Sequence, residues 1–200
     1  MAASPPAEAD GRATTLWSHA DFRKLWIGQT ISLLGSSFNG LAMQFIAASI
    51  LRATPVEMGA LAAVGTAPSL MVGLFAGVWA DRHRRRGVLI AADLGRALLL
   101  GTIPLAALVG TLSLAQLYAV SFLVGVLTVF FDVAYQSYLP TLVTRAQLVE
   151  GNSKLAISRS TATIAGVSAA GVVIQAITAP MAIALDACSY LASVCFVSLI

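Results

Sequence analysis

The chain has 200 residues, of which 58% are hydrophobic and 10% are charged, and its formal net charge is +3. Its mean hydropathy is +0.85. Soluble domains carry charge on about a quarter of their residues, so this composition excludes a soluble globular protein and predicts an integral membrane protein. A helix needs about 20 mostly apolar residues to span a bilayer, which leaves room for about six spans and little else.

The amino-terminal stretch is polar. Residues 1–20 contain prolines and both signs of charge but no apolar run. They therefore lack the apolar centre of a cleaved signal peptide. We expect residues 1–20 to form a disordered cytoplasmic tail.

Proline, glycine and charged residues divide residues 21–200 into six apolar segments, each long enough to cross a membrane. The sequence therefore predicts an all-α transmembrane domain with spans near residues 24–51, 56–80, 87–110, 113–138, 152–176 and 179–200. No polar tail follows the last segment. Because natural spans usually end in interfacial or charged anchors, we expect a chain truncated at its carboxyl terminus.

Basic residues gather on one side of this six-span path, and Arg52 alone falls on the other. Loops rich in lysine and arginine stay in the cytoplasm. The pattern therefore predicts a cytoplasmic amino terminus. The basic residues on that side are Arg12, Arg23, Lys24, Arg82, Arg84, Arg85, Arg86, Arg145 and Lys154.

The second segment has a small residue at every fourth position, and the series ends at an acid. Its members are Gly65, Ser69, Gly73, Gly77 and Asp81. In lipid, small residues four apart let another helix approach closely, although ordinary packing within the bundle explains the glycines equally well. The helix dipole disfavours a carboxylate at a helix C-terminus by about 0.3 to 1 kcal/mol, so we expect Asp81 to have a compensating partner.

The stretch from Gly77 to Gly87, GVWADRHRRRG, resembles the G-x-x-x-D-R-x-G-R-R signature of the major facilitator superfamily. Arg84 stands where that signature has its second glycine, so the family's tight turn is not implied. The matching residues are Gly77, Asp81, Arg82, Arg85 and Arg86. The stretches that resemble the branch holding enterobactin exporters and macrolide-efflux-type proteins are residues 22–35, 92–97, 139–153 and 185–193.

This resemblance covers nearly the whole chain after residue 17 and implies the amino-terminal six-helix half of a twelve-helix transporter. It implies a secondary active transporter in a cell membrane, the bacterial inner membrane, with proton-coupled efflux of a drug, siderophore or metabolite. In the family, the counterpart of Asp81 contacts the partner half and helps to hold one access state. The expected partners are the lipid bilayer, a small-molecule substrate and a carboxyl-terminal six-helix half of the same protein, and no nucleic acid.

Two charged residues inside spans four and five are expected to pair. A charge within a span costs about 2.5 to 3.5 kcal/mol on insertion scales and is usually paired or functional. Asp132 and Arg159 lie at similar distances before and after the intervening loop, so they reach the same depth on antiparallel helices. We predict an ion pair in the cytoplasmic third of the bundle, either structural or with a gating or coupling role.

Asp93 and Arg96 lie three residues apart, close enough to pair on one face of the third segment. They form either a self-contained pair or part of a network with Asp81. Asp186, near the outer end of the sixth segment, has no predicted partner, and we expect it to reach interfacial water.

Uncharged polar residues also interrupt the spans. In the resembling family the first and fourth helices line the central cavity, so we predict that Asn39, Gln44, Gln136 and Asp132 contact the substrate. The alternative for each amide is a single interhelical hydrogen bond, worth about 0.6 kcal/mol.

The fifth segment contains RSTATIAGVSAAG, which matches the G-P-x-x-G-G element of drug-proton antiporters only at Gly166 and Gly171. This departure weighs against an antiporter. Its small residues still predict close packing with another helix; they are Ser158, Ala162, Gly166 and Ala170.

Other function classes lack their motifs. Both histidines, His19 and His83, fall at the predicted cytoplasmic surface and no G-x-S-x-G is present, so we expect no enzyme. No G-x-x-x-x-G-K-[ST] loop is present either, and the loops are too short to meet a separate ATPase. We expect no cofactor and no metal. The remaining alternative is a half-size protein that does not transport or that needs a separate partner half.

Overall fold

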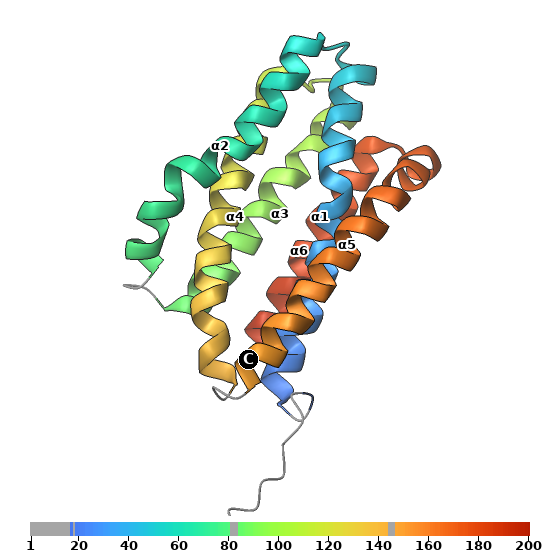
Figure 1. The fold of residues 1–200 in the computed structure, drawn as a ribbon. Coiled ribbons are helices and arrows are strands. Elements are labelled where there is room, and N and C mark those ends of the chain that lie inside the picture. The colour runs from blue at the N-terminus through green and yellow to red at the C-terminus, as the bar shows by residue number, and fades with distance from the viewer. Residues whose placement is uncertain (1–16, 18, 81–83, 144–146) are drawn as a thin grey trace, which may run out of the picture.

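The computed structural model describes residue 17 and residues 19–80, 84–143 and 147–200, and for residues 74–80 it describes the backbone only. These residues form long helices and no strand (Figure 1). The helices are α1 (Ala20–Phe45), which continues as a π-helical turn η2 (Ile46–Ile50), then α2 (Pro55–Ala80), α3 (Arg85–Val109), α4 (Leu114–Leu142), α5 (Leu148–Ile177) and α6 (Ala179–Ser198).

Six of these helices are long and apolar enough to cross a membrane, which confirms the all-α fold expected from the sequence. The predicted tail, apart from residues 17, 19 and 20, lies outside the described residues. The fourth predicted span ended at residue 138, whereas α4 continues to Leu142 through Pro140. Proline removes one backbone donor, but only two residues of helix follow it, so the helix loses little before it ends.

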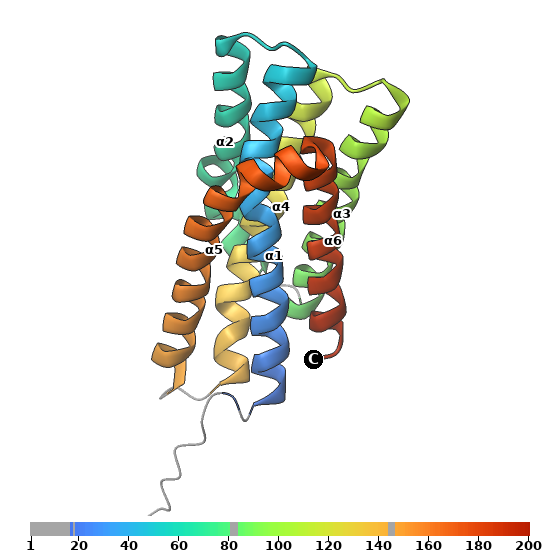
Figure 2. The same cartoon turned by 90° about the vertical axis from the view of Figure 1, so that its right-hand side faces the viewer.

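The helices form two groups joined by α3. Helix α2 packs on α4, and both α5 and α6 pack on α1. Helix α3 lies between the groups and packs on both α4 and α6 (Figures 1 and 2). Contact between α1 and α4 is slight. This arrangement leaves a space between the two groups, bordered by α1, α2 and α4.

The apolar core has two parts, separated along α3 by buried charged residues. Leu89 belongs to the part that contains Phe22 at the start of α1, and Leu100 belongs to the other part. Asp93 and Arg96 lie between them on α3 and are also buried. A polar layer therefore crosses the middle of the bundle.

Small residues bring α5 against α1. Ala162, Gly166 and Ala170 are buried, and a Cβ atom at Gly166 would collide with the side chain of Ser37 on α1. This confirms the close packing predicted for these positions of the fifth segment. The series on α2 differs, because a Cβ atom at Gly73 would meet nothing within 4 Å.

Candidate functional site

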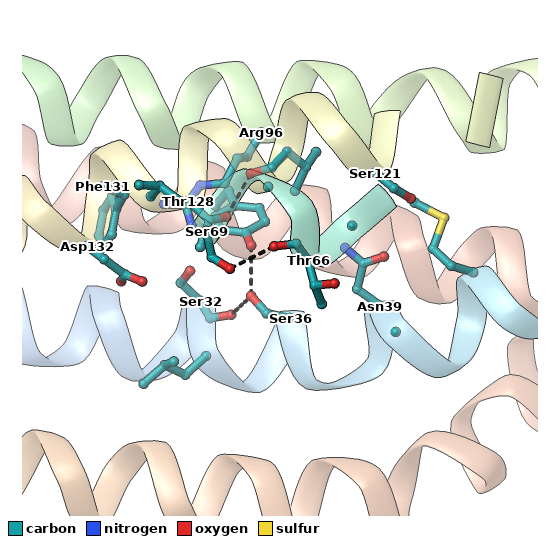
Figure 3. Close-up of a pocket in the computed structure, with 18 of the residues that line it drawn as sticks. Ser32, Ser36, Asn39, Thr66, Ser69, Arg96, Ser121, Thr128, Phe131 and Asp132 are labelled. Atoms are coloured by element: carbon teal, nitrogen blue, oxygen red, sulfur yellow. Dashed lines mark hydrogen bonds between the residues drawn. The ribbon is translucent and has the colours of Figure 1, made fainter. Parts of the chain in front are cut away.

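A cavity of about 670 Å³ occupies the space between the two helix groups. Figure 3 shows Ser32, Ser36 and Asn39 of α1 along one of its walls. The volume falls within the range of about 300 to 1,000 Å³ that is typical of sites for small organic ligands. The polar lining consists of Gln29, Ser32, Ser36, Asn39, Gln44, Thr66, Ser69, Arg96, Ser121, Thr128, Asp132, Arg159 and Tyr190.

The Asp132 carboxylate of α4 and the Arg159 guanidinium of α5 lie together at this cavity. The Arg159 Nη2 atom is 3.7 Å from Asp132 Oδ1, and the side chains are 60% and 41% exposed, respectively. Ion pairs this open to solvent contribute about 0 to 1 kcal/mol to folding. The pair therefore adds little to stability, while both charges remain available to a ligand in the cavity.

The Asp93–Arg96 pair is buried by contrast. The Arg96 guanidinium donates to Asp93 Oδ1, and the side chains are 5% and 0% exposed, respectively. The guanidinium carbon also lies 4.3 Å from the ring centroids of Phe131 and of Tyr190. Aromatic faces attract a guanidinium, so three helices hold Arg96 in place at the cavity wall.

The expectation that Asp186 reaches interfacial water is wrong, because its side chain is fully buried between helices. Helix α6 packs on α1 at Gly35, where a Cβ atom would lie 2.8 Å from Asp186 Oδ1 and would also collide with Ser189. The missing side chain at Gly35 makes room for both residues. Asp186 is thus part of the polar layer rather than of the outer surface.

The predicted substrate-contact residues divide between two cavities. Asn39, Gln44 and Asp132 line the first, whereas Gln136 lines a second cavity of about 510 Å³. Gln44 Nε2 donates to the Met58 carbonyl at 3.5 Å. Arg159 and Gln29 line both cavities.

Sequence reasoning missed most of the polar face of α1. Gln29, Ser32 and Ser36 line the first cavity with Asn39. These four residues are spaced by three, four and three positions, which places them on one face of a helix. This spacing indicates a polar helix face in the sequence alone. Serines within a span are also common where helices pack closely, so the spacing does not by itself identify a cavity wall.

The arginine-rich motif lies only partly within the described residues. Gly77 is described by its backbone alone, and Asp81 and Arg82 lie outside the described part of the chain. Arg85 donates to the Ser137 carbonyl of α4 at 2.9 Å, and Arg86 donates to the Ser198 carbonyl at the end of α6. These two arginines therefore hold helix ends, in addition to their predicted effect on topology.

Within the described part of the chain, no group of three or more His, Cys, Asp or Glu side chains is placed to hold a metal ion. Cys188 and Cys195 are free and exposed. The polar side chains that line the first cavity carry a carboxylate, guanidinium groups, amides and hydroxyls.

Known proteins resemble this chain. The family model described as transmembrane secretion effector (MFS_3) matches residues 13–199. The uncharacterised MFS-type transporter YfiS of Bacillus subtilis is 36% identical over 74 residues, which cover 37% of this chain and 18% of that protein. Macrolide efflux protein A of Streptococcus pyogenes is 28% identical over 130 residues, or 64% of this chain and 32% of that protein. The matches thus cover less than a third of either relative's length. No solved structure matches the chain.

Proposed function

Because this chain belongs to the transmembrane secretion effector family of the major facilitator superfamily, we propose that it forms the amino-terminal half of a transporter that exports a small organic molecule in exchange for protons. The observation that carries this proposal is the cavity of about 670 Å³ with acidic and basic side chains in its wall. It offers Asp132, Arg159 and Arg96 from three different helices. Groups on separate helices change their spacing when helices move, which a transport cycle requires.

The lining of the cavity suits an organic substrate. Amide and hydroxyl groups on α1, such as Asn39 and Gln44, orient polar atoms, and apolar residues such as Leu33 and Val124 contact a carbon skeleton. One relative is named a macrolide efflux protein, which supports an organic molecule as cargo. Gln136 in the second cavity extends the substrate path toward the amino-terminal end of α5.

The proposed orientation places the amino terminus in the cytoplasm of a bacterium, with the protein in the inner membrane. The starts of α1 and α5 and the ends of α2 and α4 lie at one end of the bundle (Figure 1). The described basic residues of that end include Lys24, Arg85 and Lys154, whereas Arg52 lies in the connection between η2 and α2 at the other end. This is the charge distribution of a cytoplasmic face.

A carboxyl-terminal six-helix half is the proposed partner, and it would cover the cavity between α2 and α5. In this proposal the motif residues Gly77, Asp81 and Arg82, with Arg85 and Arg86, form the conformational switch at the contact between the halves. The contacts of Arg85 and Arg86 with helix ends support this role, since a movement of α3 would break them.

The test uses the full-length protein in proteoliposomes. Efflux of a labelled macrolide and of a labelled siderophore is measured with and without a pH gradient, and a protonophore serves as the control. We expect transport that needs the gradient and that stops with the protonophore. Transport that is independent of the gradient would leave a facilitator. Absence of transport that is restored by a separately expressed carboxyl-terminal half would identify the half-size alternative.

A further inference from the structure

Asp186 is a buried acid that the proposed substrate path does not use. Its side chain is 0% exposed, and it lies against the backbone of α1, where a Cβ atom at Gly35 would approach Oδ1 to 2.8 Å. Helices α1 and α6 lie side by side along this contact (Figures 1 and 2). A carboxylate in such a place needs several donors or a nearby cation.

The hydrogen bonds around Asp186 do not suffice for a carboxylate. Ser189 Oγ donates mainly to the Asp186 backbone carbonyl, at 2.7 Å, and lies 3.3 Å from Oδ1. Ser36 Oγ donates to the Ser32 carbonyl at 2.7 Å, so its proton is already engaged, and it lies 2.9 Å from the Tyr190 hydroxyl. Asp186 Oδ2 is buried without any partner among the described residues.

A second buried oxygen close by also lacks a donor. Asn39 Oδ1, on α1, has no partner among the described residues, and the Asn39 side chain interacts with the Asp186 carboxyl group. Both oxygens are acceptors. A proton on Asp186 Oδ2 supplies the donor that the two oxygens lack, because a protonated carboxyl group donates one hydrogen bond.

The count of buried charges in the polar layer also indicates a proton on Asp186. Among the described residues, the buried charged side chains are Asp93, Arg96 and Asp186. They comprise two acids and one guanidinium, and the guanidinium is bonded to Asp93. The excess of one acid therefore falls on Asp186.

Arg96 of α3 also attracts the Asp186 carboxylate, but its one positive charge is already shared with Asp93. The remaining helices do not remove the excess of one acid. From α1, Ser36 and Asn39 face Asp186, and neither carries a charge. Tyr190, on α6 itself, adds only a phenol. Asp132 of α4 pairs with Arg159 of α5, which adds one charge of each sign. A single positive charge is still required, and one proton provides it.

We propose that Asp186 is the proton-binding carboxyl group of this half, hydrogen-bonded to Asn39 and reached from the cavity beside that residue. Asn39 lines the cavity, so a proton arriving there from water passes to an Asp186 carboxylate oxygen and makes the group neutral. Its release returns the carboxylate and the proton to water. This inference rests on the proposed function, because it assigns a residue to the proton that drives transport.

The test reads the proton directly, by infrared difference spectroscopy of the full-length protein in liposomes between acidic and alkaline buffer. The probe is the proton alone. We expect a band of a buried protonated carboxyl group that is lost in Asp186→Asn. In Asn39→Leu the band should shift, because its hydrogen-bond acceptor is gone. The surface variant Glu150→Gln should match the wild type.

The outcomes separate this inference from the proposed function. A band that persists in Asp186→Asn overturns the inference, as does the absence of any such band in the wild type. If Asp186→Asn does not fold, the carboxyl band of Asn39→Leu becomes the test. A band at the wild-type position in that variant overturns the inference. If the wild-type protein shows the band but no proton-driven transport, the result would instead contradict the proposed function.

Discussion

The guanidinium carbon of Arg96 on α3 lies 4.3 Å from the centroid of the Tyr190 ring on α6. The same carbon lies 4.3 Å from the Phe131 centroid on α4, so aromatic faces from two helices contact one cation. A guanidinium removed from water against aromatic rings gains roughly 2 kcal/mol or more. Arg96 therefore sets the spacing of α3, α4 and α6 where they border the cavity.

The first prediction concerns the charge of this residue. Arg96→Gln should lower the free energy of unfolding by about 3 to 5 kcal/mol, because it leaves the buried Asp93 without its partner. Arg96→Lys should also destabilise the protein, by about 1 to 2 kcal/mol, since an ammonium lacks the planar shape that stacks on both rings. Unfolding of the purified protein in detergent measures both.

The matched control is the double variant Asp93→Asn with Arg96→Gln. It removes both charges and should recover much of the stability lost in Arg96→Gln alone, because no uncompensated charge remains. A double variant as unstable as the single one would show that the aromatic contacts, rather than the ion pair, determine the loss.

The second prediction uses two glycines of α5. Gly166→Ala should destabilise the protein by about 1 to 3 kcal/mol, because the added methyl group collides with Ser37 of α1. Gly171→Ala is the control, since a Cβ atom there meets nothing within 4 Å; it should be neutral or stabilising by up to about 1 kcal/mol. Thermal unfolding of the two variants should differ, and equal midpoints would mean that α5 does not pack on α1 at Gly166.

The sequence predicted the helices well because long apolar runs and their polar boundaries determine where a chain can cross a bilayer. It also predicted two ion pairs. Asp93 and Arg96 lie three residues apart on one helix, and Asp132 and Arg159 lie about equally far from the loop that joins their helices. The functional roles of these pairs remain predictions.

The sequence was less informative about side chains that meet across helices distant in the chain. Asp186 is buried because Gly35, about 150 positions earlier, leaves space for it. Gly28 and Gly35 lie seven residues apart on the face of α1 that meets α6, yet their partner helix cannot be read from spacing alone. For the same reason, the sequence did not predict that Gln136 lines a different cavity from the other predicted substrate contacts. The two cavities share wall residues such as Arg159.

The third prediction distinguishes the arginines of the loop motif. Arg86→Gln should destabilise the protein by about 0.3 to 1 kcal/mol, because it removes a cation from the Ser198 carbonyl at the C-terminus of α6. Arg84→Gln is the control, since Arg84 is exposed and donates no side-chain hydrogen bond to any described residue. Equal unfolding midpoints would reduce both arginines to topological signals.

The fourth prediction tests whether the Asp132–Arg159 pair works in transport. Asp132→Asn should change the free energy of unfolding by less than about 1 kcal/mol, because the pair is open to solvent. Transport should nevertheless fall by about tenfold or more, since loss of a charged hydrogen bond in the site costs about 1.5 to 3 kcal/mol. The two effects are measured on one preparation, by unfolding in detergent and by gradient-driven efflux in proteoliposomes.

The control for this last prediction is Glu150→Gln, which removes an acid of similar exposure from α5. Glu150 pairs with Lys154 at 3.4 Å and does not line either cavity. Its loss should leave both stability and efflux near wild-type values. Full efflux by Asp132→Asn, with an unchanged dependence on pH, would make the pair purely structural. An equal loss of efflux in Glu150→Gln would instead attribute the effect to the net charge of the protein rather than to the pair.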